Sequence, residues 1–299
     1  MTAPRLSLDP DAAAYLERLR AAPPLWTLTP QQARDAHVAG SPTVSRPGAD
    51  VETVHDGVVA GVPVRTYRPA GAEGVTVYLH GGGWVVGTLD TYDGVCRDLA
   101  AASGTTVISV GYDLAPEVRH PGQAAQCVAV VQEAARRHGG RAVALAGDSA
   151  GAHLAVLAAV RAGVPLTALA LVYPVVSPAL DTPSARENAT GYALETEGMR
   201  WYWSQYLPDG SSGEQPDDVP VDLLQLDLAG LPPALLLTAG FDPLRDEGLA
   251  LADALEAAGV DVERVAFDGQ VHGFFRTDAV IGESAAARSV VGEFLRRHG

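Results

Sequence analysis

Leu145-Ala-Gly-Asp-Ser-Ala-Gly151 is the stretch of sequence that decides the fold. Apolar residues from Val143 onward run directly into it, and Ala- and Leu-rich sequence typical of a helix follows it. We therefore expect a buried strand, a sharp turn and a helix, with Ser149 at the apex of the turn and its hydroxyl directed away from the strand. Gly147 and Gly151 lack the side chains that would collide where the strand and the helix cross.

This serine pattern is weak evidence when taken alone. A chain with 13 serines and 32 glycines in 299 residues would contain about 0.15 Gly-x-Ser-x-Gly patterns by chance. The rest of the chain must therefore supply a base, an acid that orients the base, and N–H donors for an oxyanion.

The composition excludes several classes of protein. The chain can bury a large core, because 47% of its residues are hydrophobic, and its length suits one α/β domain with an insertion or two small domains. The formal net charge is −15, so nucleic acid and anionic membranes are poor partners. All 21 basic residues are arginines, which excludes a catalytic lysine.

Signal peptides, membrane-spanning runs and cysteine-based sites are the next features to consider. No signal peptide or long apolar run is evident, and we expect a cytoplasmic protein with no membrane partner. Cys96 and Cys127 fall on apolar faces of expected helices and should be buried. They form neither a disulfide framework nor a metal site.

Short apolar strands alternate with helices along most of the chain. The pattern predicts an antiparallel pair at 51–54 and 62–68, joined by a turn at Asp56-Gly57 and beyond. Further strands are expected at 75–79, 105–110, 142–146, 166–172, 234–239 and 260–267, and helices at 91–102, 123–138, 150–162, 243–258 and 283–297. This alternation predicts an α/β fold with a mostly parallel central sheet covered by helices on both faces.

Two segments depart from the alternation. Residues 1–50 have an irregular helical pattern, and residues 177–220 interrupt the series with an insertion that ends in an acidic loop. The insertion places Met199, Tyr202, Trp203 and Tyr206 at helical spacing. These side chains could dock the insertion on the body, or some of them could line a substrate pocket, and the two interpretations are compatible.

The motif His80-Gly-Gly-Gly-Trp84 directly follows the expected strand at 75–79. Chance predicts only about 0.01 copies of His-Gly-Gly-Gly in this composition, so the signal is far stronger than that of the serine pattern. Three glycines allow backbone N–H groups to turn inward, where two of them, with the N–H of Ala150, would bind an oxyanion. The alternatives are a flexible loop or a phosphate cradle, but no Lys-Ser/Thr follows and the loop is not a Walker motif.

A base and an orienting acid are expected where strands end at the carboxyl edge of the sheet. Asp242 follows the strand at 234–239, and His272 follows the strand at 260–267. Where the nucleophilic serine lies on a strand-turn-helix motif, the triad residues follow one another along the chain in the order Ser, Asp, His, which is the order here. Asp242 also has a simpler interpretation, because it could cap the helix that begins at Pro243.

Five motifs together resemble the hormone-sensitive-lipase-like esterases, the bacterial family IV carboxylesterases of the α/β-hydrolase superfamily. The motifs are His80-Gly-Gly-Gly-Trp84, Tyr112-Asp-Leu-Ala-Pro-Glu117, Gly147-Asp-Ser-Ala-Gly151, Asp242-Pro-Leu-Arg-Asp-Glu247 and His272-Gly-Phe274. The resemblance covers nearly the whole chain and implies one domain over 1–299, with a helical cap built from about 1–48 and about 177–220.

The resemblance also implies roles for individual residues. Ser149 is expected to be the nucleophile, His272 the base and Asp242 the orienting acid. The expected oxyanion donors are Gly82, Gly83 and Ala150, with Gly81 less certain. His80, Glu117 and Asp148 are expected to support the site, Glu117 by bonding N–H groups of the glycine loop unless it is merely an exposed loop charge. The expected lining of the substrate pocket is Trp84, Tyr202, Trp203, Leu244 and Phe274.

The sequence departs from the family pattern in places. Asp113 stands where the family usually has arginine, which puts the family's local ion pair in doubt. His153 departs from the usual Gly-Gly-Asn and is expected at a structural position on the helix after Ser149.

The predicted function is a serine carboxylesterase that hydrolyses short- to medium-chain esters through an acyl-enzyme, without metal or cofactor. One alternative is hydrolysis of an amide, formyl-amide or N-acetyl bond by the same triad. Another is a binding protein that has lost catalysis, which the presence of all three triad residues argues against. The expected partner is a small ester, and a homodimer is left open.

Overall fold

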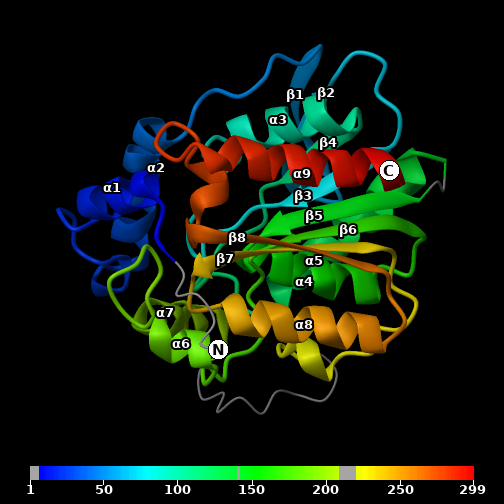
Figure 1. Cartoon of the computed structure of the whole chain (residues 1–299). Coiled ribbons are helices and arrows are strands. Elements are labelled where there is room, and N and C mark those ends of the chain that lie inside the picture. The colour runs from blue at the N-terminus through cyan, green and yellow to red at the C-terminus, as the bar shows by residue number, and fades with distance from the viewer. Residues whose placement is uncertain (1–6, 140–141, 209–219) are drawn as a thin grey trace.

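The computed structural model describes residues 7–139, 142–208 and 220–299. An eight-stranded sheet runs through it (Figure 1). The strands are β1 (Thr53–Val59), β2 (Val62–Arg68), β3 (Val75–Leu79), β4 (Thr106–Val110), β5 (Val143–Asp148), β6 (Leu166–Val172), β7 (Ala234–Phe241) and β8 (Val262–Val271). Their order is β1-β2-β4-β3-β5-β6-β7-β8, with β1 and β2 antiparallel to their neighbours and the other pairs parallel. The predicted α/β class with a mostly parallel sheet is confirmed.

The first hairpin corrects one expectation. Asp56 and Gly57, predicted to form a turn, lie inside β1, where Asp56 pairs with Arg65 of β2. The chain turns instead at Ala60-Gly61, where both residues have positive φ values of 49° and 83°. A two-residue loop with positive φ at both positions matches the twist of the flanking strands, so it sets the register of the hairpin.

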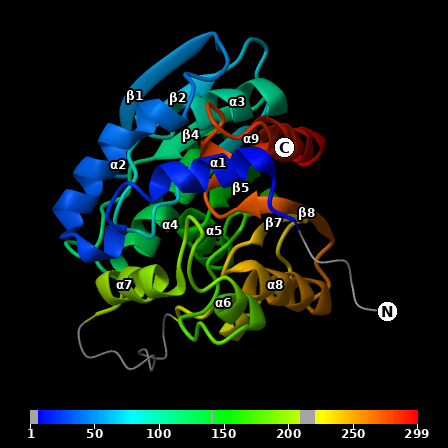
Figure 2. The ribbon, with the colours of Figure 1, turned by 60° about the vertical axis from the view of Figure 1, so that its left-hand side comes forward.

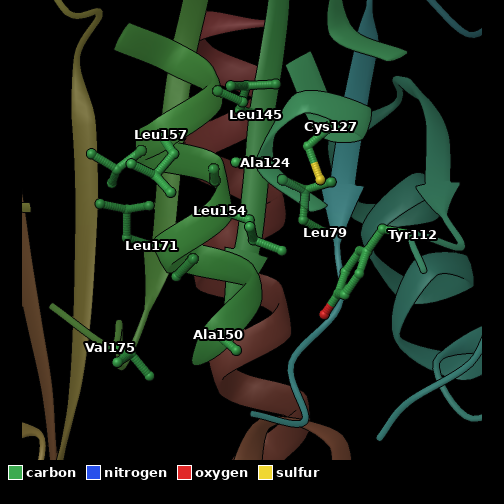
Figure 3. Close-up of a cluster of buried hydrophobic side chains, with 14 of the residues drawn as sticks. Leu79, Tyr112, Ala124, Cys127, Leu145, Ala150, Leu154, Leu157, Leu171 and Val175 are labelled. Carbon is green, nitrogen blue, oxygen red and sulfur yellow. The ribbon is translucent and has the colours of Figure 1, made fainter. Parts of the chain in front are cut away.

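Helices cover both faces of the sheet (Figures 1 and 2). One face carries α3 (Asp93–Ser103) and α9 (Glu283–His298), and the other carries α4 (Gly122–Arg137), α5 (Ala150–Arg161) and α8 (Arg245–Ala257). Figure 3 shows side chains of α5, α4 and the central strands meeting in the core of the second face. Cys127 is buried in this core and Cys96 in the other, as predicted. Among the described helices, none is both long and apolar enough to cross a membrane.

The two segments predicted to form a cap lie beyond the same end of the strands of the sheet (Figures 1 and 2). The N-terminal segment contains α1 (Pro10–Leu19), the short helix η1 (Leu25–Thr27) and α2 (Pro30–Val44), and the insertion contains α6 (Pro183–Glu187) and α7 (Thr196–Tyr206). They touch where Trp26 packs on Gly198, leaving no space for a Cβ atom there. Parts of the predicted cap, at 1–6 and 209–219, and most of the predicted acidic loop lie outside the described residues.

Candidate active site

Ser149 sits in the predicted turn between β5 and α5. Its φ of 54° and ψ of −121° are unusual for a residue with a side chain and mark a strained turn. A Cβ atom on Gly147 would overlap Gly151, and one on Gly151 would overlap the carbonyl oxygen of Leu79. The turn therefore requires both glycines, as the sequence predicted, because strand and helix cross in contact.

Ser149, His272 and Asp242 form a continuous chain of hydrogen bonds. Ser149 Oγ lies 2.9 Å from His272 Nε2, and His272 Nδ1 lies 2.7 Å from Asp242 Oδ2. Asp242 directly follows β7 and His272 directly follows β8, so parallel strands bring both to the end of β5. In this geometry the imidazole can take the serine proton while the carboxylate holds the Nδ1–H tautomer and stabilises the imidazolium.

The Asp242 side chain makes both a helix-capping hydrogen bond and a hydrogen bond to His272. Its Oδ1 accepts a hydrogen bond of 2.8 Å from the N–H of Leu244, which satisfies a donor at the start of α8, while Oδ2 faces His272. The side chain is fully buried, and 11% of the His272 side chain is exposed. Capping and orientation are therefore compatible because each uses one oxygen.

The glycine loop lies beside Ser149. The N–H of Gly81 donates to Asp148 Oδ1 at 2.8 Å, so this group is occupied and we leave Gly81 out of the candidate oxyanion donors. Among the described residues, no acceptor bonds the N–H groups of Gly82 and Gly83. Ala150 is the first residue of α5, and its N–H has no acceptor within the helix.

Asp148 ties the glycine loop to the serine turn. Its buried carboxylate accepts hydrogen bonds from Tyr78 (2.7 Å), Tyr92 (3.0 Å) and the N–H of Gly81. Burial raises the pKa of Asp148, and these hydrogen bonds oppose the rise because they favour the ionised form. The carboxylate thus holds the loop at a fixed distance from Ser149.

His80 is buried behind the loop. Its Nδ1 lies 2.8 Å from the carbonyl oxygen of Gly81, and its ring stacks on Tyr112 with centroids 4.3 Å apart. Burial lowers the pKa of His80 to about 4, so it is neutral near pH 7. The imidazole is therefore a packing and hydrogen-bonding group in the wall of the site, and it does not titrate near neutral pH.

Glu117 corrects another expectation. It does not bond N–H groups of the glycine loop but pairs with Arg34 of α2, whose Nη1 lies 2.9 Å from its Oε1. Arg34 also donates to the carbonyl oxygens of Val85 (2.9 Å) and Ala115 (2.8 Å). Glu117 lies on a loop that faces α2, so a guanidinium is its nearest donor, and this hydrogen bond lowers the pKa of Glu117. The nearby Asp113 side chain instead accepts from Gln126 at 2.7 Å.

Most of the predicted pocket residues pack as core. Trp84 stacks on Tyr206 with centroids 4.1 Å apart and contacts Trp203 at 4.6 Å, and His153 meets Trp84 edge-on at 5.2 Å. This cluster joins the glycine loop, α5 and α7, which favours the docking interpretation for these aromatic side chains. His153 is fully buried on α5, as expected of a structural position.

The other predicted pocket residues differ in their surroundings. Tyr202 packs directly on Gly83, where an added Cβ would overlap its ring. Leu244 and Phe274 are buried in the cores on opposite faces of the sheet. Tyr202, one of the predicted pocket residues, therefore packs against Gly83, a candidate oxyanion donor.

Sequence reasoning missed three residues around the candidate triad. The ring of Tyr173 lies 4.5 Å from that of His272, the Asn188 side chain donates to the carbonyl oxygen of Asp242 at 3.0 Å, and Arg34 joins α2 to the glycine loop. The rule that functional residues follow strand ends could have found Tyr173, which comes directly after β6. Arg34 and Asn188 carry no such signal because they lie in the irregular segments.

Comparisons with known proteins agree with this geometry. The family described as alpha/beta hydrolase fold matches residues 76–276. The chain is 35% identical to an ethyl acetate hydrolase of Pseudomonas putida, over 98% of this chain and 100% of the relative. It is 38% identical to the carboxylic ester hydrolase LipN of Mycobacterium tuberculosis, over 79% of this chain and 67% of the relative. A solved thermostable esterase from Pseudomonas putida matches with a TM-score of 0.88 at 32% identity, covering 100% of this chain and 99% of the other.

Proposed function

Because the chain belongs to the hormone-sensitive-lipase-like branch of the α/β-hydrolase family and is a carboxylic ester hydrolase, we propose that Ser149, His272 and Asp242 are its catalytic triad. The observation that carries the proposal is the unbroken hydrogen-bonded chain of 2.9 Å and 2.7 Å from the serine to the buried carboxylate. A serine hydroxyl is a poor nucleophile at neutral pH, and such a chain is what activates it.

The first half of the reaction forms the acyl-enzyme. His272 Nε2 takes the proton from Ser149 Oγ as the oxygen attacks the ester carbonyl. The oxyanion then accepts hydrogen bonds from the N–H groups of Gly82, Gly83 and Ala150, each worth about 3–4 kcal/mol in other hydrolases. The imidazolium, stabilised by Asp242, gives its proton to the departing alcohol.

The second half repeats these steps with water as the nucleophile. His272 deprotonates the water, which attacks the acyl carbonyl, and the same N–H groups bind the second oxyanion. Collapse of this intermediate breaks the bond to Ser149 Oγ, which recovers its proton from His272, and the carboxylic acid leaves.

The proposal extends to the substrate and the surroundings of the site. We place α1, α2, α6 and α7 in a cap over the site, and propose that it encloses the acyl chain of a short- to medium-chain ester. The packing of Tyr202 on Gly83 and the ethyl acetate hydrolase among the relatives support a small acyl group. A cytoplasmic location, and the formation of a homodimer, are further hypotheses for which the sequence alone is the guide.

The test is a series of p-nitrophenyl esters from acetate to palmitate, assayed on the wild type and on Ser149→Ala. We expect the wild type to turn over butyrate or hexanoate fastest and Ser149→Ala to fall to the background rate with an unchanged urea unfolding curve. Ser204→Ala, which removes an exposed hydroxyl on α7, is the matched control. Wild-type rates in Ser149→Ala would refute the triad, and fastest turnover of palmitate would refute the chain-length proposal.

A further inference from the structure

Arg276 lies four positions after His272 in the chain and has no acidic partner among the described residues. It ends the short helix η3 (Phe274–Arg276), which follows His272, and its carbonyl oxygen accepts a 2.5 Å hydrogen bond from Ser45 at the end of α2. The guanidinium makes one long hydrogen bond, 3.5 Å from Nη1 to Ser41 Oγ. Across the described residues, no carboxylate lies within ion-pair distance of it.

Carboxylates and aromatic rings commonly bind a guanidinium, and those described below are paired with other arginines. The nearest carboxylate in sequence, Asp278, pairs with Arg288 at 3.0 Å and also accepts the N–H of Arg46. Within the described ranges, the guanidinium groups that lie over aromatic rings are those of Arg97 and Arg297. Arg276 is therefore held in place by its backbone, while its charge is left without a structural partner in the described part of the chain.

The charge of Arg276 affects the pKa of two tyrosines that pack beside residues of the site. Burial raises the pKa of Tyr202 to about 12, and the Arg276 charge opposes this rise. Burial likewise raises the pKa of Tyr173, and Arg276 again acts in the opposite direction. Tyr202 packs on Gly83 and the Tyr173 ring lies 4.5 Å from that of His272. Contacts point to the same region, because α2, whose Ser41 meets the guanidinium, also carries Arg34, which donates to the Val85 carbonyl next to the glycine loop.

A second unpartnered group faces the same region. His37 lies one helical turn before Ser41 on α2, and its Nε2 is buried with no hydrogen-bond partner among the described residues. Burial lowers the pKa of His37 well below its usual value, and the Arg276 charge lowers it further, so the imidazole is neutral. A buried polar nitrogen normally has a partner, and a neutral imidazole in its Nε2–H tautomer can donate to an anion.

We propose that Arg276, assisted by His37, binds a carboxylate carried by the ester substrate. This inference rests on the proposed function and names a substrate class for it. A guanidinium presents paired donors that match a carboxylate, and partial burial strengthens such hydrogen bonds. The net charge of −15 repels acidic esters at long range, so a local cation is what would let the site accept them.

Two classes of acidic ester carry this chemistry. In a half-ester of a dicarboxylic acid the carboxylate is on the acyl side, and in an O-acyl hydroxy acid it is on the alcohol side. The guanidinium recognises the same group in both. Matched neutral esters distinguish the sources: ethyl hexanoate against monoethyl adipate, and isobutyl butyrate against O-butyryl glycolate.

The test compares kcat/KM for each acidic ester with that for its neutral partner, measured by titration of the acid released. In Arg276→Gln we expect the acidic-to-neutral ratio to fall by about 10- to 100-fold for at least one pair, the loss expected for a hydrogen bond to a charged group. Arg276→Lys should restore part of the ratio because it keeps the charge. Arg46→Gln removes one exposed positive charge near α2 and should keep the wild-type ratio.

The outcomes separate this inference from the proposed function. Equal ratios in the wild type and Arg276→Gln for both pairs, with neutral esters still hydrolysed, would overturn the carboxylate subsite alone. An equal fall in Arg46→Gln would also overturn it, because the effect would then be one of net charge. Failure of the wild type to hydrolyse any of the four esters would overturn the proposed function, and the subsite with it.

Discussion

Asp242 uses its two carboxylate oxygens for two separate hydrogen bonds, and Asp242→Asn disturbs only one of them. Oδ1 accepts from the N–H of Leu244 at 2.8 Å, which the amide oxygen of asparagine can replace. The amide NH₂ then faces His272 Nδ1, which must accept instead of donate. The imidazole is driven to the Nε2–H tautomer, which cannot take the proton of Ser149.

The expected loss follows from this change of tautomer. The equivalent substitution in another serine hydrolase lowers kcat by about 10⁴-fold, which corresponds to about 5.5 kcal/mol of activation free energy. Stability should change little in Asp242→Asn because the Leu244 N–H keeps an acceptor. Asp242→Ala should be equally inactive but should also lose about 1–3 kcal/mol of unfolding free energy, because it leaves that buried N–H unpaired.

The assay pairs p-nitrophenyl butyrate hydrolysis with urea unfolding for both variants. Asp253→Asn is the matched control, because Asp253 lies on the same helix and pairs with Arg264 at the surface. We expect wild-type kinetics from this control. Retention of more than about a tenth of the wild-type kcat in Asp242→Asn would refute the assignment of Asp242 as the acid that orients His272.

Two further predictions concern the glycine loop and pH. Gly83→Ala should lower kcat/KM by about 100-fold, because its Cβ would overlap Tyr202 at a φ of +58° and displace an oxyanion donor; Gly40→Ala, with open space around it, should keep full activity. Burial lowers the pKa of His153 to about 3 and that of His80 to about 4, below the unfolded value of 6.5. As the pH falls below 6.5, these histidines therefore become protonated in the unfolded chain before they do so in the folded chain. The unfolding free energy should be constant above pH 6.5 and should fall toward pH 4 by up to about 1.4 kcal/mol per pH unit for each histidine. A urea midpoint that is equal at pH 7 and pH 5 would contradict this.

The sequence led to the proposed triad because its members follow a local rule. Asp242 and His272 each come directly after a parallel strand, and the topology brings such positions to one edge. Local patterns also placed β3 and β6 at their observed bounds. The Asp56-Gly57 turn failed because the same dipeptide fits a strand when its aspartate pairs across the hairpin with Arg65.

Contacts between distant segments could not be predicted in this way. Glu117 pairs with Arg34, 83 positions away, and nothing in either local sequence indicates the other. Likewise the spacing of the aromatic residues in the insertion predicted a helix, α7, but could not tell which of its side chains face the core. The structure settles this by stacking Trp84 on Tyr206 and placing Tyr202 on Gly83.

These long-range contacts suggest a second role for the proposed cap segments. The glycine loop is held from one side by Asp148, which accepts the Gly81 N–H, and from the other by Arg34 on the Val85 carbonyl and Tyr202 on Gly83. The direction of the Gly82 and Gly83 N–H groups therefore depends on α2 and α7 as well as on the sheet. Hydrogen-bond donors stabilise an oxyanion best when they are fixed in place before the reaction. The segments that we propose as a cap would thus also help to position the proposed oxyanion donors.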